Sequence, residues 1–304
     1  MTESEEMWYG IVYFSISICL FPIFAVVMKV LHSKTHHNPN TTYSLMNLIL
    51  LTELIQVTCH FVTSPIFIFP ELQIELGEVV RIFGNILNTF WIFEFPATTI
   101  LAVCRVLIFT DVMKSGKMPV VLKLIISLIT ISLITMSITC YQTKSFISSP
   151  PGWKYDQSAP YTPFFESLEI LIVFPCLTFN YISYILIAYL IYMKKRGSTV
   201  QSRKNELEIL IQYTLLTIYT TVSIIAWHKG VIWFDMGDAC IQAIINALWI
   251  LGCAFNPVLT LVLNRSIRNQ CLRMIRLKHP FDEVPHLAAF SGNHLFAAYH
   301  QNHH

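Results

Sequence analysis

Long apolar runs alternate along the chain with short polar or charged segments. Seven of the runs reach the length of about 20 residues that an α-helix needs to cross the hydrocarbon core of a bilayer. They cover residues 7–31, 43–69, 79–109, 118–141, 164–192, 207–227 and 240–263. Segments of about ten residues with alternating hydrophobicity, which are typical of membrane β-barrels, are absent from the sequence. The pattern therefore predicts an all-α fold, a bundle of seven transmembrane helices.

The seventh run contains a helix breaker and is followed by a basic segment. Asn256 and Pro257 interrupt the apolar sequence, and a proline in a membrane helix is a natural place for a bend. The residues that follow alternate arginines with apolar side chains, which predicts a short amphipathic surface helix over residues 265–277. We expect Ile267 and Cys271 to face lipid in this helix. A single membrane domain then covers residues 1–277, and residues 278–304 form a tail.

Composition and charge support this membrane assignment and give it an orientation. Only 12% of the residues are charged, against about 25% in soluble domains, and the net charge of +2 gives no support for nucleic-acid binding. The loops on the C-terminal side contain 16 of the 20 lysines and arginines, and the opposite side contains four. Basic loops remain in the cytoplasm, so the N-terminus is predicted to be extracellular and the C-terminus cytoplasmic, in the plasma membrane.

The eight cysteines include no CxxC pair, and the sequence predicts no cofactor and no structural metal site. Cys140 and Cys240 fall near the predicted outer helix ends, where either a disulfide or two buried free thiols would be compatible with the pattern. The longest outer connection, residues 142–163, is rich in proline and is predicted to be a loop or lid rather than a domain.

Two carboxyl groups lie inside predicted spans, where an ionisable side chain is costly and is therefore a candidate for function. Glu53 and Glu94 are each about 15 Å from the inner surface at 1.5 Å per residue, and Asn256 lies slightly nearer the inside, roughly 11 Å deep. We expect these three residues to form a polar cluster. The two carboxyls would then share a proton or bind Na⁺. The alternative is that each is protonated and hydrogen-bonded separately.

Three further side chains outline a possible cavity in the outer half of the bundle. His60 follows Glu53 by seven residues, on the same helix face, and Asn88 and Trp91 lie one to two turns outward of Glu94. These three residues are candidates for a ligand pocket, although a lone histidine on such a face is also compatible with simple packing.

Arg105 stands at the predicted inner end of the third helix. It either pairs across helices in a closed state and is released on opening, or extends to the membrane surface as an anchor. The cross-helix pairing is the preferred interpretation.

Several of these residues resemble motifs of the rhodopsin-like G-protein-coupled receptors. Asn256-Pro257 resembles the NPxxY motif, Arg105 in LAVCRVLIF resembles the arginine of the DRY motif, and Glu53 occupies the place of an acidic residue in the second helix. The chain departs from the pattern at Cys104, where the family has an acid, and at Thr260, where it has tyrosine. The outer cysteine of the third helix, the tryptophan of the fourth and the CWxP motif are also missing.

Such eroded motifs, and the run LWILGCAFNPVLTLVLNRSIRNQ in particular, resemble the nematode serpentine chemoreceptors of the srt and srx types. The resemblance implies a receptor that binds environmental small molecules, signals through heterotrimeric G proteins and resides in sensory cilia, with Arg105, Asn256 and Pro257 in activation and coupling. The sequence contains no HExxH, GxSxG or similar catalytic motif, so we do not expect an enzyme. The alternative function is an ion or proton transporter or channel that uses Glu53, Glu94 and His60.

Overall fold

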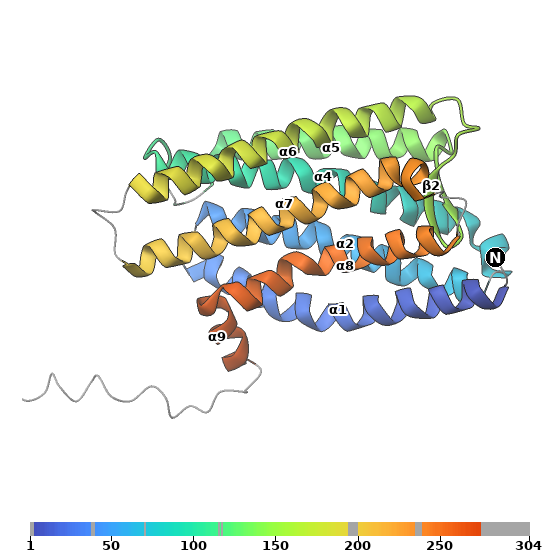
Figure 1. Ribbon diagram of the computed structural model, residues 1–304, viewed down its shortest axis with the longest axis horizontal. Helices are drawn as coiled ribbons and strands as arrows, with labels where there is room; N and C mark the ends of the chain where they lie inside the picture. Colours follow the sequence, from blue (N-terminus) through green and yellow to red (C-terminus); the bar gives the residue numbers. More distant parts are fainter. Residues whose placement is uncertain are drawn as a thin grey trace, which may run out of the picture.

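The computed structural model describes residues 3–37, 40–69, 71–114, 116, 118–193, 200–234 and 239–274. Its helices are α1 (Glu3–His37), α2 (Thr41–Ile68), α3 (Glu71–Glu75), α4 (Gly77–Phe109), α5 (Val120–Gln142), α6 (Thr162–Met193), α7 (Val200–Phe234), α8 (Ala239–Leu263) and α9 (Arg265–Met274). Two short strands, β1 (Phe146–Ser149) and β2 (Gly152–Tyr155), lie between α5 and α6. The prediction of a seven-helix bundle with a short additional helix is confirmed (Figure 1).

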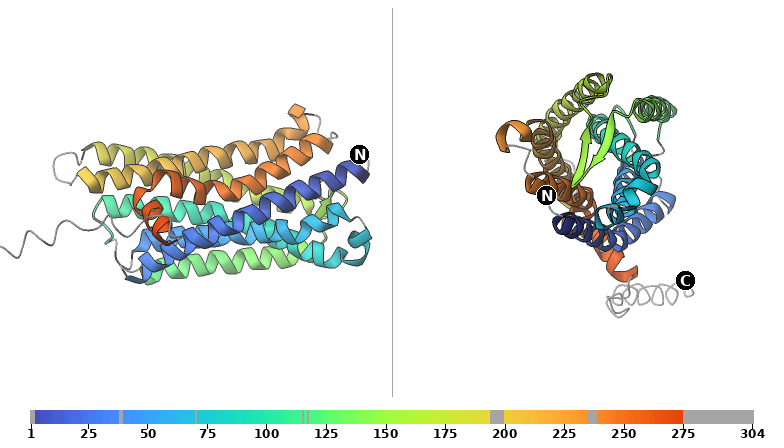
Figure 2. Two further views of the ribbon diagram at one scale, coloured as in Figure 1. Left: turned by 90° about the horizontal axis from the view of Figure 1, so that it is seen from below. Right: turned by 90° about the vertical axis from the view of Figure 1, so that its right-hand side faces the viewer.

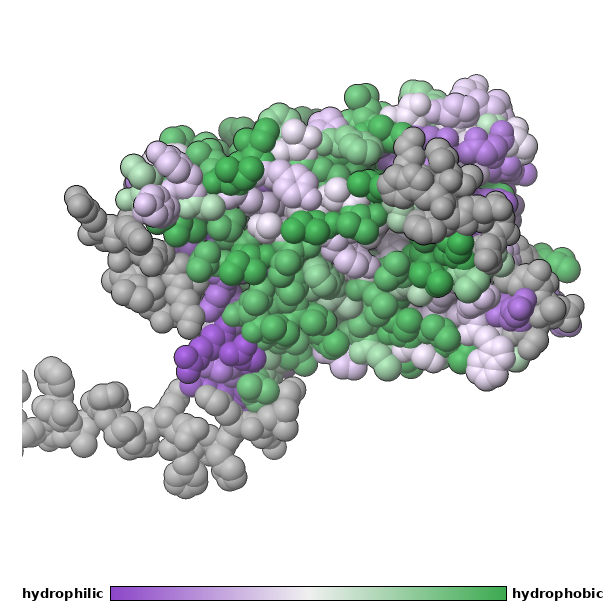
Figure 3. Space-filling model, viewed as in Figure 1, coloured by the Kyte–Doolittle hydropathy of each residue, from purple (hydrophilic) through white to green (hydrophobic). Residues whose placement is uncertain are grey.

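Seven of the described helices, all except α3 and α9, are long and apolar enough to cross a membrane. They lie side by side, with α2 and α4 packed against each other inside the bundle and α5 packed on α4 at its edge (Figures 1 and 2). Hydrophobic residues cover the middle of the face shown in Figure 3. A multi-pass membrane protein follows from these observations.

The bundle has two distinct ends. The start of α1 and the β1–β2 hairpin lie at one end, which we call the hairpin end, and α9 lies at the other, which we call the α9 end (Figure 1). Seven crossings place these ends on opposite sides of the bilayer.

The hairpin within residues 142–163 is antiparallel, and it pairs Phe146 with Tyr155 and Ser149 with Gly152. Viewed down the bundle, it lies across the hairpin end, among the helices (Figure 2, right). The indole of Trp153 is 1% exposed and stacks on Phe146 with ring centroids 5.8 Å apart. The sequence pattern predicted a loop or lid here. The paired strands were not foreseen, because each is only four residues long and Pro150 and Pro151 lie between them.

Trp153 fits a slot that exists because residue 84 of α4 is glycine. A Cβ atom at Gly84 would lie 2.2 Å from Cζ3 of Trp153, which is far inside van der Waals contact. The hairpin is also held by Tyr13 of α1, whose hydroxyl lies 2.9 Å from the carbonyl oxygen of Pro151. Tight packing therefore attaches the hairpin to the bundle.

Cys140 and Cys240, which both lie within the described residues, are not joined by a disulfide. Cys140 is buried in the core of the bundle, whereas Cys240 is exposed at the start of α8. The alternative of two buried thiols holds for Cys140 and is wrong for Cys240.

Helix α9 forms where the basic segment predicted it, but its apolar face has a different neighbour. Ile267 and Cys271 are buried and α9 packs on α1 and α8, so the expectation that these side chains face lipid is wrong. Asn264 begins the helix by accepting a hydrogen bond from the Ile267 N–H (3.1 Å), which turns the chain back toward the bundle. The predicted residues 275–277 and the tail 278–304 lie outside the described residues.

The Gly84 slot can be tested with a single methyl group. We expect Gly84→Ala to lower the thermal stability of the purified protein, because overpacking of a tight contact costs roughly 1–3 kcal/mol. Gly77→Ala is the matched control on the same helix, since a Cβ there meets no atom within 4 Å. The measurement is the apparent Tm in detergent. Equal values for Gly84→Ala and wild type would contradict the tight packing of Trp153.

Candidate functional site

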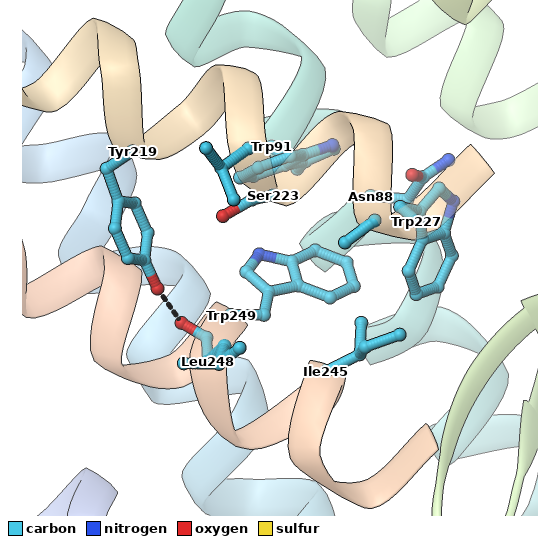
Figure 4. A pocket seen from close by; sticks show the side chains of 10 residues that line it. Asn88, Trp91, Tyr219, Ser223, Trp227, Ile245, Leu248 and Trp249 are labelled. Atoms are coloured by element: carbon cyan, nitrogen blue, oxygen red, sulfur yellow. Dashed lines mark hydrogen bonds between the residues drawn. The ribbon is translucent and has the colours of Figure 1, made fainter. Parts of the chain in front are cut away.

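A cavity of about 170 Å³ lies between α4, α7 and α8 in the half of the bundle toward the hairpin end (Figure 4). We call it the tryptophan cavity. Its lining residues are Asn88, Trp91, Tyr219, Val222, Ser223, Ala226, Trp227, Ile245, Leu248 and Trp249. None of these lining side chains carries a formal charge. The cavity is therefore suited to a small, largely apolar molecule.

Three indole rings from three helices meet at this cavity. The centroid of Trp249 on α8 lies 5.3 Å from that of Trp91 on α4 and 5.6 Å from that of Trp227 on α7. Because each ring belongs to a different helix, the shape of the cavity depends on the spacing of α4, α7 and α8.

Two of the three residues predicted for a ligand pocket, Asn88 and Trp91, line the tryptophan cavity. His60 is not among its lining residues. Its ring packs edge-on against Trp249 at a centroid distance of 5.3 Å and is 2% exposed, so it lies behind the cavity wall.

A chain of hydrogen bonds joins the cavity to the hairpin. Asn88 Nδ2 donates to the Tyr155 hydroxyl oxygen (3.0 Å), and that hydroxyl donates to Oε2 of Glu169 on α6 (2.8 Å). Burial, followed by the neighbouring Glu169 carboxyl, raises the pKa of Tyr155 well above its usual range, so its hydroxyl keeps the proton that it donates. Trp91 Nε1 donates to the other oxygen of Glu169 (3.3 Å), and His228 Nε2 lies 3.8 Å from that same oxygen. The hairpin, α4, α6 and α7 thus meet at one buried carboxyl.

On the opposite side of the cavity, Trp249 connects to the polar interior of the bundle. Its Nε1 donates to Oε1 of Gln56 on α2 (3.0 Å), and Gln56 Nε2 donates to Oε2 of Glu94 on α4 (3.1 Å). Gln56 therefore uses both ends of its amide to join three helices.

A second set of bonds lies one to two turns nearer the α9 end. Asn256 Nδ2 of α8 donates to Oε2 of Glu53 on α2 (3.2 Å), and Asn256 Oδ1 accepts from Nε2 of Gln212 on α7 (2.7 Å). The same Gln212 nitrogen lies 2.7 Å from the hydroxyl oxygen of Thr260, which donates to the Asn256 carbonyl (2.9 Å). We call these two sets together the amide network: Gln56, Glu94, Glu53, Asn256, Gln212 and Thr260.

The structure thus places Glu53 beside Asn256, and Glu94 beside Gln56. Within the described residues no hydrogen bond joins the two carboxyls, and no group of three or more His, Cys, Asp or Glu side chains is arranged to hold a metal ion. Each carboxyl has its own amide partner. This is the arrangement expected if the two carboxyls are hydrogen-bonded separately. The shared proton and the Na⁺ ion stay predictions.

At the α9 end, Arg105 turns inward. Its side chain is 2% exposed, and Nη2 donates to Oε2 of Glu206 near the start of α7 (2.7 Å). The same nitrogen lies 3.2 Å from the Glu206 carbonyl oxygen. The guanidinium therefore ties α4 to α7 instead of extending to the membrane surface.

The family to which this architecture belongs is decided by comparison with known sequences. The family described as Serpentine type 7TM GPCR chemoreceptor Srt matches residues 1–283. The chain belongs to the Srt family. No curated protein matches it. Membership makes it a chemoreceptor of the G-protein-coupled receptor type, and this confirms the resemblance that the seventh-helix segment indicated.

Sequence reasoning missed several residues of this Srt site. Gln56 and Gln212 are amides within apolar runs, and Glu169 is a single acid in LEILIVF, so a search for all polar side chains within the spans would have found them. Glu206 carries no such signal, because it stands among other charges before the sixth apolar run. Only the folded chain shows that it meets Arg105.

Replacing Gln56 tests whether the amide network stabilises this fold. Gln56→Leu would leave the Trp249 N–H without its acceptor and Glu94 without its donor, at a cost of roughly 1–3 kcal/mol for each. We expect a lower apparent Tm, measured in detergent. Thr58→Val on the same helix is the control, since the Thr58 hydroxyl donates only to Leu54 O of its own helix. A Gln56→Leu protein that melts with the control would contradict the structural importance of the network.

Proposed function

We propose that a small ligand binds in the tryptophan cavity and shifts the bundle toward a state that binds a heterotrimeric G protein at the α9 end. The observation that carries the proposal is a path along α8 and across to α7. Trp249 in the cavity wall and Asn256 beside Pro257 both belong to α8. Asn256 accepts a hydrogen bond from Gln212 of α7, and Glu206 of the same helix pairs with Arg105. A change in the cavity can therefore act on a contact at the other end of the bundle.

The size and lining of the cavity define the ligand class. Its volume of about 170 Å³ is close to that of an engineered apolar cavity of about 150 Å³ that binds benzene. Three indole rings line it, while Ser223 and Asn88 supply hydroxyl and amide groups. The expected ligand is a compact, uncharged molecule, aromatic or aliphatic, with at most one or two hydrogen-bonding groups.

Helix α8 provides the mechanical link. Trp249, Asn256 and Thr260 are all buried on the face of α8 that meets α2 and α7. Pro257 lies between the last two and lacks the N–H that would hold the preceding turn rigid. A ligand that displaces Trp249 would bend α8 at this proline, and the Gln212 amide would transfer the movement to α7.

The end of the path is the ion pair of Arg105 and Glu206. Glu206 precedes Gln212 by six residues, about 9 Å along α7, so a movement of α7 acts directly on the pair. The pair stabilises the closed arrangement. Its loss would free Arg105 and the start of α7 to bind a partner protein. Activation is then a shift of the population from the closed state to the partner-binding state.

This proposal places the hairpin end outside the cell and the α9 end in the cytoplasm, as the lysine and arginine distribution predicts. Conduction through Glu53, Glu94 and His60 receives no support from the site, because none of the three is a lining residue of the tryptophan cavity.

The orientation of the receptor can be tested with epitopes at its two ends. We expect an epitope at the N-terminus to be detected on intact cells and one at the C-terminus only after permeabilisation. The reverse staining pattern would show that the receptor has the opposite orientation and would contradict the proposal.

The ion pair gives a test of signalling without a known ligand. We expect Glu206→Gln to raise basal nucleotide exchange on a G protein about fivefold for each ~1 kcal/mol that the pair contributes to the closed state. Arg105→Ala is expected to abolish ligand-evoked exchange. Glu208→Gln, two residues further along α7, is the matched control and is expected to signal as wild type. A basal rate that Glu206→Gln leaves unchanged would show that the pair does not hold the receptor closed.

The cavity is tested by filling it. A screen of volatile and soluble compounds against cells expressing the receptor supplies an activating compound. We expect Ser223→Leu, which adds a branched side chain within the cavity, to reduce its potency at least tenfold, whereas Ser223→Ala keeps the space open and retains the response. Surface expression is measured for both variants. Undiminished activation of a well-expressed Ser223→Leu receptor would place the ligand elsewhere.

A further inference from the structure

A second concave surface lies outside the bundle core, in a groove between α4 and α5. It has a volume of about 330 Å³ and lies in the half toward the hairpin end. Its lining residues are Ile82, Asn85, Ile86, Thr89, Phe90, Ile134, Ser137, Ile138 and Tyr141. Ile82, Ile134 and Ile138 are 44–53% exposed, so the groove opens on the surface that the membrane covers. Its occupant must come from the bilayer.

The groove contains a buried acceptor that lacks a donor. Asn85 is 3% exposed, and its Nδ2 donates to the Arg81 carbonyl oxygen (2.8 Å). That bond fixes the orientation of the amide, because the flipped amide would place two oxygens against each other. Among the residues that the structure describes, none donates to Asn85 Oδ1.

A buried donor without an acceptor lies one turn away. Nε of Arg81 has no hydrogen-bond partner in the described part of the chain, while its Nη2 is paired with Glu78. Residues four apart lie on the same face of a helix, so Arg81 and Asn85 are neighbours. Two unsatisfied groups in an apolar setting each cost free energy, and one hydroxyl group satisfies both, since it accepts and donates.

The hydroxyls already in the groove are engaged elsewhere. Thr89 donates to the carbonyl oxygen of Asn85 (2.6 Å), and Ser137 of α5 donates to the same oxygen (3.3 Å). Neither of these hydroxyls therefore donates to Asn85 Oδ1.

Arg81 and Tyr141 lie near the hairpin end of the groove, close to the start of α4 and the end of α5. The guanidinium of Arg81 lies over the ring of Tyr141, 4.6 Å from its centroid, and the Tyr141 hydroxyl donates to Glu78 (3.0 Å). Such aromatic and charged side chains are typical of the interface. Asn85 is about 6 Å deeper, and beyond it the lining is apolar.

We propose that the α4–α5 groove binds a membrane sterol. Its single hydroxyl donates to Asn85 Oδ1 in the groove and accepts from Nε of Arg81, which adjoins the groove without lining it. Its rigid apolar body lies along Ile86, Phe90 and Ile134. A phospholipid fits less well, because its phosphate needs cationic partners, and the charge of Arg81 is already paired with Glu78 through Nη2. The site is separate from the tryptophan cavity, although both are lined by α4.

The test uses the full-length receptor in phosphatidylcholine nanodiscs that contain a diazirine-bearing cholesterol. After illumination, we expect mass spectrometry to find the label on residues 82–90 and 134–141. Cholesterol is expected to compete for this labelling roughly tenfold better than cholesteryl methyl ether, which has the same body and accepts a hydrogen bond but donates none. Labelling confined to other segments, or equal competition by the two sterols, would overturn the proposal, the latter because water would then satisfy Asn85.

Two variants assign the discrimination to one atom. Asn85→Leu keeps the approximate volume and removes the acceptor, so cholesterol and its methyl ether should compete equally. Thr130→Val on α5 is the matched control, because the Thr130 hydroxyl donates only to Ile126 O of its own helix, and it should preserve the tenfold difference. A full difference retained in Asn85→Leu would also overturn the proposal. If Asn85→Leu does not fold, the comparison of the two sterols on the wild-type receptor decides alone.

Discussion

The structure depends on one constraint: polar side chains within a bilayer have no water to bind, so they must find one another. In this chain the constraint selects amides as partners for carboxyls. Gln56 donates to Glu94 and Asn256 donates to Glu53, and each bond crosses from one helix to another. Gln212 adds α7 to the same set. Because an unpaired amide or carboxyl at this depth is costly, the bonds fix the rotation and the relative height of α2, α4, α7 and α8.

The same constraint explains how a small cavity can influence a distant surface. Trp249 is both a wall of the cavity and a donor to Gln56, so its ring cannot move without breaking or carrying a buried hydrogen bond. Helix α5 is the opposite case, because it packs mainly on α4 and most of its surface faces lipid. The core helices therefore carry the proposed transmission, while α5 offers a surface to the membrane.

The sequence was sufficient for the properties that follow from apolar length and helix rise. It predicted the seven-helix bundle. Counting residues from the helix ends placed Glu53 and Glu94 at one depth and Asn256 slightly nearer the inner surface, and of these three residues the structure joins Asn256 to Glu53. It failed for features that depend on the direction of a side chain or on contacts between residues far apart in the sequence. The Trp153 slot depends on a glycine in another helix, and the Glu206 partner of Arg105 is 101 residues away. The apolar face of α9 has the same composition whether it meets lipid or the bundle, so pattern alone could not choose.

The departure of this chain from the DRY motif now has a physical meaning. Where the rhodopsin-like pattern has an acid beside the arginine, this chain has Cys104, which offers no carboxylate. Arg105 therefore relies on Glu206 of α7, and within the described residues its Nη1 has no hydrogen-bond partner. An adjacent acid would pair with the arginine within one helix, whatever the distance to α7. A partner on a different helix holds it only while α4 and α7 stay together. In this Srt receptor the proposed closed state is thus stabilised by a bond between moving parts, and its population follows the separation of these two helices directly.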